Sequence, residues 1–273
     1  MPPRLPAYFD YLIDAFHQGK AGRFVHLGYW EAPSGAQGQD FGVAQQRLDE
    51  RILALAGIVS GQAVLDVGCG FGGTLAALNQ RLGRMWLAGV NVDPRQLAIC
   101  RQVVAAESNR LEWQEADACR LPFAAASFDA VLSIEAMFHF PSRRIFFAEA
   151  ARVLKPGGVL VGSDITLAPS ARALDVPGFC IEAPLQDGYG PWPDFWGDDA
   201  DHAALAAAAG LGNGTLFDAS AHTLPSHRFT ASEDTSDARD TGNAALRAAF
   251  MLRWLHRAGH LRYSLFRFEK PRA

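Results

Sequence analysis

Apolar residues recur every three or four positions along several stretches of the chain, which is the spacing of a helix with one buried face. Between Val43 and Ala56, for example, Leu48, Ile52 and Leu55 share such a face. Short apolar runs suited to buried strands lie between these stretches, at 63–67, 85–92, 111–117, 128–135 and 158–166. Further helices are expected at 74–82, 94–107 and 142–154. Strands that alternate with helices predict βαβ units and a parallel sheet.

The pattern loosens toward both ends of the chain. The start holds an aromatic-rich helix candidate, 6–16, and the segment VHLGYWE. After Ile165 a helix is expected at 198–210, a strand at 215–220, and a closing helix and strand from residue 244 onward. We predict an N-terminal lid, 1–42, and a core, 43–273, with a cap or acceptor-pocket insertion at about 168–200 and 219–243.

Composition and charge exclude some partners. A net charge of -4 gives no overall reason to expect nucleic acid. No stretch is apolar enough to span a bilayer and the start lacks a signal-peptide pattern, so no membrane partner is expected. The cysteines favour a reducing cytoplasm because no C-x-x-C pair occurs among Cys69, Cys100, Cys119 and Cys180. A small-molecule partner is expected, for a chain that is a monomer or a homodimer.

The stretch AVLDVGCGFGGT, residues 63–74, ends a strand in a run of glycines and matches two nucleotide-binding fingerprints. Gly68, Gly70 and Gly73 fit the G-x-G-x-x-G of a dinucleotide site. Gly68, Gly70 and Gly72 fit the D-x-G-x-G-x-G loop that holds S-adenosylmethionine. In both cases glycines let backbone N–H groups approach a ligand where a helix begins. The loop alone leaves the choice of cofactor open.

Polar side chains around the loop favour S-adenosylmethionine. Asp66 stands two residues before the first glycine, where a carboxylate attracts an amino group and a sulfonium but repels a pyrophosphate. An acid that binds ribose is expected at the end of the second strand, and Asn91 stands there, with Asp93 two positions on. Asp117 follows the third strand and suits the exocyclic amine of adenine.

Four segments, in this order and spacing, resemble the class I S-adenosylmethionine-dependent methyltransferases: VLDVGCGFGGT, GVNVDPRQL, EADACRLPFAAASFDAVLSIEAMFHF and ARVLKPGGVLVGSDI. The resemblance covers roughly Val43 to Thr166, plus the terminal helix and strand. HLGYWE and EAMFH are similar to segments of small-molecule enzymes, namely sterol, tocopherol and bacterial secondary-metabolite methyltransferases.

That resemblance implies both a fold and a reaction. The expected fold is α/β and Rossmann-like, with a seven-stranded, mostly parallel sheet, helices on both faces and an antiparallel last strand, 261–269. The expected reaction is methyl transfer from S-adenosyl-L-methionine to an O, C or N atom of a small-molecule acceptor in natural product biosynthesis.

The resemblance also implies which residues hold the cofactor: Asp66, Gly68, Cys69, Gly70, Gly72, Asn91, Val92, Asp117, Ala118, Glu135, His26 and Tyr29. Asp66 and the glycines would line the methionine end, and Asn91 would take the ribose hydroxyls where many relatives have an acid. Asp117 and the backbone of Ala118 would meet adenine. His26, Tyr29 and Trp30 would close over the cofactor, although simple packing within the lid is favoured for Trp30.

For catalysis, the methyl of this cofactor is already electrophilic, so the enzyme mainly aligns a nucleophile with it. A hydroxyl or phenol acceptor also benefits from a base, and His139 fits by type and place. The resemblance implies an acid after the fifth strand beside that histidine, and Asp164 matches it, which makes His139 and Asp164 a base and orienting pair. Glu135 is an alternative base, above all for carbon methylation. Otherwise His139 only packs between Phe138 and Phe140, and Asp164 only caps a loop.

Other features have simpler interpretations. A buried cap is favoured over a cation-binding box for the aromatic residues that follow the fifth strand, Tyr189, Trp192, Phe195 and Trp196. His256 and His260 have the helical spacing of metal ligands, but no Cys or acid completes a set. Helix-end capping is therefore favoured for them, and no metal is expected.

Three further functions stay open. One is an enzyme that consumes S-adenosylmethionine by intramolecular cyclisation or elimination and releases methylthioadenosine. A second is a cofactor-binding partner protein without catalysis, and a dinucleotide-dependent reductase is the weaker third. Methylation of amino groups in DNA is disfavoured because IEAMFHF stands where D/N-P-P-Y would follow the fourth strand.

Overall fold

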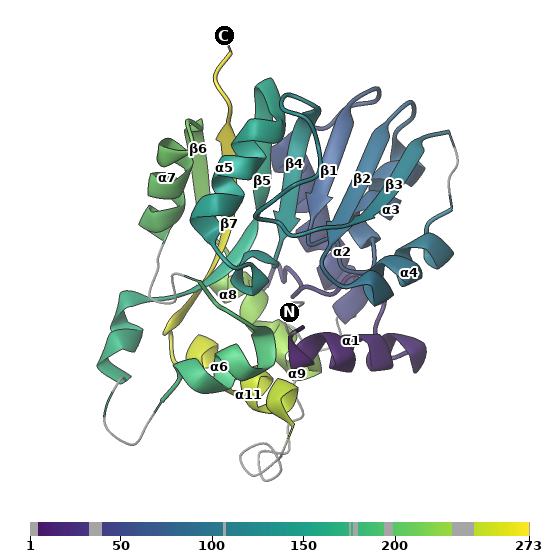
Figure 1. The fold of residues 1–273 in the computed structure, drawn as a ribbon. Coiled ribbons are helices and arrows are strands. Elements are labelled where there is room, and N and C mark those ends of the chain that lie inside the picture. Colours follow the sequence, from purple (N-terminus) through teal and green to yellow (C-terminus); the bar gives the residue numbers. More distant parts are fainter. Residues whose placement is uncertain are drawn as a thin grey trace.

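The computed structural model describes residues 5–32, 40–105, 108–174, 176, 180–193, 199–230 and 243–272. Within this part of the chain one seven-stranded sheet has the order β3-β2-β1-β4-β5-β7-β6. The strands are β1 (Ala63–Val67), β2 (Trp86–Asn91), β3 (Arg110–Glu115), β4 (Phe128–Ile134), β5 (Leu154–Leu167), β6 (Gly212–Asp218) and β7 (Leu261–Glu269). β1 to β5 pair in parallel, whereas β7 lies antiparallel between β5 and β6 (Figure 1). The predicted sheet and its antiparallel last strand are confirmed.

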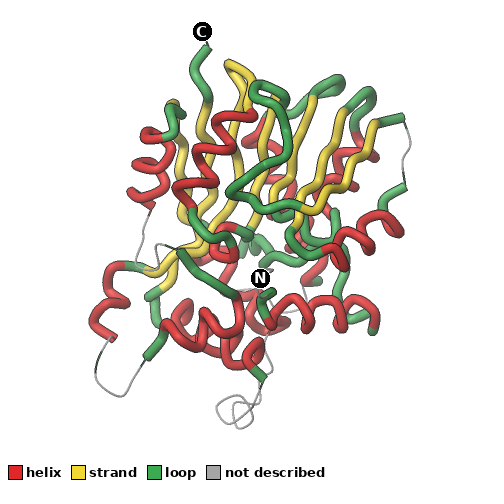
Figure 2. The backbone as a smooth tube through the Cα atoms, in the orientation of Figure 1, coloured by secondary structure: helices red, strands yellow, loops and turns green. Residues whose placement is uncertain are grey.

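Helices cover both faces of the sheet, as Figure 2 shows. Because successive side chains of a strand point to opposite faces, the apolar run in β1 serves two cores. Val64 packs in the core that α2 (Phe41–Ala56) and α3 (Gly73–Arg81) help to form. Leu65 and Val67 pack in the core of α5 (Arg143–Val153) and α7 (Asp199–Ala208).

Polar side chains at the first turns fix where several helices begin. The carboxylate of Asp40 accepts a hydrogen bond from Gly42 N at 2.7 Å at the start of α2. Asp93 accepts from Arg95 N at 2.9 Å at the start of α4 (Pro94–Val103), and Ser142 accepts from Ile145 N at 3.2 Å at the start of α5. Such caps satisfy N–H groups that have no partner within the helix.

A layer of helices lies across the carboxyl ends of the parallel strands (Figure 1). It consists of α1 (Ala7–His17), α6 (Glu182–Tyr189), α8 (Ser220–Thr223), α9 (His227–Thr230) and α11 (Ala244–Arg257), with the 3-10 turns η2 (Met137–His139), η3 (Pro169–Leu174) and η4 (Leu224–Ser226). α1, α6 and α11 contact one another. The layer draws on segments from both ends of the chain.

Some elements differ from the expectations. α6 lies in a region expected to be irregular, because its Pro and Gly residues hid a short helix whose Leu185 and Tyr189 are buried. β5 begins at Leu154, before the KPGG segment, because residues on that side of the turn still pair with β4. Phe195 and Trp196 lie outside the described residues, as does most of 231–243.

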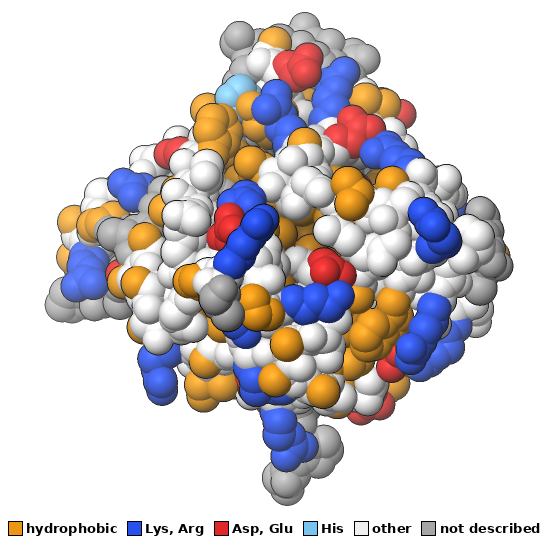
Figure 3. Space-filling view, turned by 90° about the horizontal axis from the view of Figure 1, so that it is seen from above, with side chains coloured by type: hydrophobic (Ala, Val, Ile, Leu, Met, Phe, Trp, Pro, Cys, Tyr) orange, Lys and Arg blue, Asp and Glu red, His pale blue; other side chains and the backbone are white. Residues whose placement is uncertain are grey.

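The surface carries mixed charge. On the face shown in Figure 3, basic side chains are spread out among acidic and uncharged ones and form no continuous stripe. Among the described helices, none has the length and hydropathy that crossing a membrane requires.

Candidate active site

A cavity of about 870 Å³ lies at the carboxyl ends of β1, β2, β3 and β4, and α1, α6, α9 and α11 contribute to its walls. β1 is the point where the strand order reverses, since the chain runs from β1 to β2 on one side and returns to β4 on the other. Open α/β sheets bind their ligands in the crevice at this reversal. The cavity volume is within the range of small-molecule sites.

The glycine loop forms the part of the cavity wall next to β1. Gly68 and Gly70 line the cavity with positive φ angles of 80° and 53°. A Cβ on Gly68 would lie 2.5 Å from the Cβ of Ala136, and one on Gly70 would lie 2.6 Å from Val25. Both positions therefore need glycine so that the backbone stays open to a ligand.

Cys69 and Gly72 were expected at the cofactor, but neither is among the residues that line the cavity. Cys69 donates its backbone N–H to Val90 O at 3.1 Å. Gly72 caps α3 with a φ of 78°, and a Cβ there would lie 2.8 Å from Trp113. Their place in the structure is to shape the loop from its core side.

Asp66, the last residue but one of β1, is a buried carboxyl, and it too is not among the lining residues. Burial raises the pKa of Asp66 to about 8, and the nearby charge of Asp49 adds to the effect. Asp49 is itself buried, and its Oδ1 accepts a hydrogen bond from Thr74 Oγ1 at 2.6 Å. Two acids beneath the loop therefore favour a cation close to them.

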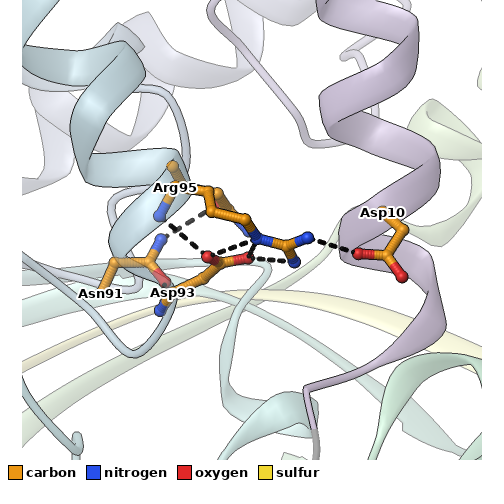
Figure 4. Close-up of polar contacts among 5 residues, drawn as sticks. Asp10, Asn91, Asp93 and Arg95 are labelled. Atoms are coloured by element: carbon orange, nitrogen blue, oxygen red, sulfur yellow. Dashed lines mark hydrogen bonds and ion pairs between the residues drawn. The ribbon is translucent and has the colours of Figure 1, made fainter.

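The end of β2 presents amides where a ribose-binding acid is usual. Asn91 lines the cavity, accepts from Asp93 N at 3.0 Å and donates Nδ2 to Gln96 Oε1 at 3.1 Å (Figure 4). Gln96 also lines the cavity, and its buried Nε2 has no hydrogen-bond partner within the described residues. Sequence reasoning missed Gln96, although its place in the first turn of α4 brings it back over the end of β2.

An ion-pair bridge runs beside this amide pair. The guanidinium of Arg95 holds the buried Asp93 through Nη2 at 2.8 Å and reaches Asp10 on α1 through Nη1 at 2.7 Å (Figure 4). It therefore joins the N-terminal helix to the element that positions Asn91.

Val92 after β2, Asp117 and Ala118 after β3, and Glu135 after β4 also line the cavity, as expected. Asp117 Oδ1 accepts from Cys119 N at 2.8 Å. Glu135 has an unusual positive φ of 50° at the end of β4. Such a backbone is costly away from glycine and is common at functional sites.

Glu135 joins three distant parts of the chain. Its Oε2 accepts from Leu27 N at 2.9 Å and from Tyr263 OH at 2.8 Å. Burial raises its pKa to about 7, against the lowering effect of these two hydrogen bonds. This carboxyl is therefore poised to change its charge near neutral pH.

His139 lines the cavity from η2 and has a defined tautomer. Its Nδ1 is hydrogen-bonded to the carbonyl oxygen of Tyr189, which can only accept, so Nδ1 carries the proton and Nε2 keeps a free lone pair. The rings of Tyr8 and Phe9 on α1 lie 6.3 and 5.0 Å from the imidazole centre. Burial lowers the pKa of His139 to about 4, so the imidazole is neutral at physiological pH.

Asp164 corrects the expectation of an orienting acid beside His139. It is fully buried, and it is not among the residues that line the cavity. Its Oδ2 accepts from Arg143 Nε at 2.6 Å and from His202 Nε2 at 2.9 Å. Burial alone would raise its pKa, but the Arg143 guanidinium and His202 outweigh burial and hold the pKa below its usual value.

The ion pair of Asp164 does reach the site indirectly. Arg143 also donates to the carbonyl of Pro193, and Trp192 N donates to Phe138 O at 3.0 Å. The segment between Tyr189 and Pro193 is thus held at both ends, and it carries the carbonyl that sets the tautomer of His139. Asp164 thus reaches this segment through Arg143.

The N-terminal segment supplies one lining residue of the two expected. His26 lines the cavity, its Nδ1 donates to Leu27 O at 2.8 Å, and its buried Nε2 has no partner in the described part of the chain. Burial lowers its pKa to about 4, so the lone pair on Nε2 is free. Tyr29 is not among the lining residues, because it stacks on His222 with ring centres 4.3 Å apart and packs beneath Arg51. Trp30 is fully buried, as favoured.

His256 does not act as a helix-end cap. It is buried and bonds His227 and Ser220 O, whereas His260 pairs with Ser170 Oγ at 3.0 Å. A cluster of His, Cys, Asp and Glu able to hold a metal is not found among the described residues.

The residues present fit S-adenosylmethionine better than a dinucleotide. The glycines leave an open cradle, and two residues of the cavity wall, His26 and Gln96, each have a buried polar atom with no hydrogen-bond partner among the described residues. A bound ammonium or sulfonium would favour the ionised form of Asp66 beneath the loop, whereas a pyrophosphate would oppose it.

Comparisons with known proteins agree with this fit. The model of a family described as a methyltransferase domain matches residues 65–162. Methyltransferase GfsG of Streptomyces halstedii is 40% identical over 162 residues, 57% of this chain and 57% of that protein. An O-methyltransferase of Pyrenophora dematioidea is 36% identical over 163 residues, 59% of this chain and 60% of its own. The chain thus matches less than two thirds of the length of these relatives.

A solved structure extends the likeness to the whole fold. The crystal structure of the [4+2]-cyclase SpnF superposes with a TM-score of 0.74 over 98% of this chain and 94% of that one, at 21% identity. At this identity the likeness concerns the fold alone. Residues 65–162 thus match a methyltransferase domain, and the glycine loop and the sheet order agree with that match.

Proposed function

We propose that this protein transfers a methyl group from S-adenosylmethionine to a hydroxyl oxygen of a small-molecule acceptor, in secondary metabolism. The observation that carries the proposal is one cavity shared by the glycine loop and His139, whose tautomer leaves a lone pair free. An oxygen acceptor is favoured over carbon or nitrogen because relatives at 36% and 35% identity are named O-methyltransferases.

The cofactor would be held by residues at the ends of four strands. Gly68 and Gly70 provide the cradle, and the Asp66 carboxylate attracts the positive end. Asn91 and Gln96 would bind the ribose hydroxyls, Gln96 by donating its free Nε2–H. Asp117 and Ala118 would meet adenine, and the lone pair of His26 would accept from the amino group. When bound, the cofactor supplies an electrophilic methyl group on a sulfonium.

His139 would act as the base. Its Nε2 accepts the hydroxyl proton as the acceptor oxygen gains the methyl, and the Tyr189 carbonyl stabilises the resulting imidazolium through Nδ1–H. An imidazole with a pKa lowered to about 4 is a weak base, but it is always unprotonated at neutral pH. Glu135 would ionise close to neutral pH, hold Leu27 at the cavity wall and bond the buried Tyr263 behind it.

Residues of the N-terminal region would serve as a lid. α1 places Tyr8, Phe9 and Leu12 on the cavity, and these apolar surfaces would exclude water from the reacting groups. α6 and the segment that follows it would form the other side of the acceptor pocket, with Tyr189 and Pro191 on the cavity wall.

The test is transfer of label from methyl-labelled S-adenosylmethionine to a panel of macrolide, polyketide and phenolic alcohols. We expect S-adenosylhomocysteine as the co-product and a methyl ether as the product. His139→Gln should lower kcat about a hundredfold, within the usual contribution of a general base, with little change in cofactor affinity. His260→Gln, which alters a histidine outside the cavity lining, is the matched control.

Two results would point elsewhere. Methylthioadenosine in place of S-adenosylhomocysteine would support the cyclisation or elimination reaction instead. Tight cofactor binding with no product from any alcohol, amine or carbon acid would support a non-catalytic partner protein.

A further inference from the structure

His227 lines the cavity, as do Phe229 and Thr230 of α9 and Ala249 and Leu252 of α11. Its position is fixed by its neighbour. Ser226 Oγ accepts from Gly28 N at 2.8 Å and from Trp30 Nε1 at 2.9 Å, which ties the start of α9 to the N-terminal segment. His227 itself is almost completely buried.

Two hydrogen bonds behind His227 set its tautomer. His256 Nε2 lies 2.9 Å from the carbonyl oxygen of Ser220. A carbonyl only accepts, so His256 carries its proton on Nε2 and has a lone pair on Nδ1. His227 Nε2 lies 2.9 Å from that Nδ1 and must therefore donate to it. The neutral ring of His227 is left with its lone pair on Nδ1.

Both rings stay neutral at ordinary pH. Burial lowers the pKa of His227 to about 3, and the charges of Arg253 and Arg257 act in the same direction. Burial lowers the pKa of His256 to about 4, although its bond to Ser220 and the charge of Asp218 oppose the change. The two hydrogen bonds therefore form a relay in which both point the same way. His227 donates to His256, and His256 donates to the backbone carbonyl of Ser220.

We propose that His227 is a specificity-determining residue whose Nδ1 accepts a hydrogen bond from a hydroxyl or N–H group of the acceptor molecule. The proposal rests on the proposed function, because it takes this part of the cavity as the acceptor site. Phe229, Ala249 and Leu252 line the cavity together with His227, so the acceptor that fits best carries one donor group on an apolar frame in addition to the hydroxyl that is methylated. A molecule that lacks the donor group leaves the buried lone pair of His227 without a partner. That penalty discriminates between acceptors more strongly than the gain from one added hydrogen bond does.

The test compares two probes that differ in one group, biphenyl-4-ol and 4-methylbiphenyl. Titration calorimetry of the full chain with S-adenosylhomocysteine bound should show biphenyl-4-ol binding about fivefold more tightly, the ratio expected for one neutral hydrogen bond. His227→Phe should reduce this ratio to about one, whereas His139→Phe should retain it. His256→Gln can replace both hydrogen bonds of the relay and should retain the ratio, and His256→Leu should lower it.

Nitrogen NMR of ¹⁵N-labelled protein gives a reading that does not depend on catalysis. It should show His227 protonated at Nε2 and bare at Nδ1, with an upfield shift of Nδ1 on addition of biphenyl-4-ol only. The proposal is wrong if Nδ1 carries the proton, if wild type does not prefer the hydroxyl probe, or if His227→Phe keeps the preference. Failure of the proposed function would instead appear as absent methyl transfer while the tautomer and probe preference stand.

Discussion

Asp66 is a carboxyl group whose charge depends on what binds beside it. In the free protein, burial and Asp49 raise its pKa to about 8, so it holds a proton at neutral pH. A bound ammonium or sulfonium would favour the carboxylate and displace that proton. If the proposed cofactor site is right, cofactor binding and proton release are coupled at this position.

The consequence is a pH-dependent affinity. Between pH 6.5 and 8 we expect the Kd for S-adenosylhomocysteine to fall as pH rises, with release of up to one proton per molecule bound. Calorimetry in two buffers of different ionisation enthalpy measures the protons released. Asp66→Asn should bind more weakly and lose the pH dependence. An affinity that stays constant over this range in wild type would contradict the coupling.

Gln96 offers a second test at this scale. Gln96→Leu keeps the size of the side chain but removes the free Nε2–H and also Oε1, which accepts from Asn91 Nδ2 at 3.1 Å. We expect cofactor affinity to fall at least about fivefold, because a hydrogen bond to a ribose hydroxyl is lost and so is the bond that orients Asn91. Gln102→Leu, at an exposed position of the same helix, is the control. Equal affinity in both variants would remove Gln96 from the site.

Single residues were the hardest part to predict from sequence. The place of Asn91 and Asp117 at the cavity can be predicted from their position at the end of a strand, because parallel strands bring their carboxyl ends to one edge of the sheet. Asp164 also ends near that edge, but its side chain packs with Arg143 and His202, and only tertiary packing decides such a direction. Tyr29 was misplaced for the same reason, since His222 and Arg51 enclose it from distant parts of the chain.

At the scale of elements, Arg95 links α1 to α4 by pairing with two carboxylates that differ in exposure. Asp10 is 67% exposed, whereas Asp93 is fully buried. Exposed ion pairs contribute little, but removing the partner of a buried carboxylate leaves its charge poorly compensated. The two halves of one bridge should therefore respond differently to substitution.

We expect Asp10→Asn to change the free energy of unfolding by less than about 1 kcal/mol. Arg95→Ala should cost about 2–3 kcal/mol, because Asp93 keeps its backbone hydrogen bond but loses the guanidinium. Urea unfolding followed by circular dichroism measures both. Equal losses in the two variants would show that the contact with α1 matters more than the buried carboxylate.

Element boundaries were predicted well where the pattern was periodic. β1 was expected at 63–67 and spans Ala63–Val67, because Gly61 and Gly68 on either side of the apolar run mark where the strand begins and ends. α6 was missed because its eight residues, Glu182–Tyr189, include Pro184 and Gly188 and lack a helical pattern. Packing against α11 stabilises it, and that contact has no local signal.

For the whole molecule, buried acids and buried histidines have opposite effects on how stability changes with pH. Burial raises the pKa of Asp49 to about 6, of Glu135 to about 7 and of Asp66 to about 8. Carboxyls with raised pKa values destabilise the fold progressively as pH rises from their unfolded values near 4. Burial lowers the pKa of His26 and His139 to about 4, and these histidines destabilise it as pH falls below about 6.5.

Together, these buried acids and histidines predict a pH at which the free energy of unfolding is greatest. Below pH 6.5 the two groups oppose each other, whereas from pH 6.5 to 8 only the acids still titrate. The free energy of unfolding of the free protein should therefore fall by about 2 kcal/mol across that upper interval. Denaturant titrations at pH 5, 6.5 and 8 measure it, and Asp66→Asn should reduce the fall. Stability that rises from pH 6.5 to 8 would refute the assignment of these acids.

The carbonyl groups of Tyr189 and Ser220 have a practical consequence for redesign of the enzyme. The protonated edges of His139 and His256 are held by main-chain oxygens, which no substitution can delete. The side chain at 189 can then be enlarged or trimmed to accommodate a different acceptor without altering which nitrogen of His139 is free. A library built at Tyr189 and Pro191 should therefore change substrate scope while the proton-accepting machinery persists.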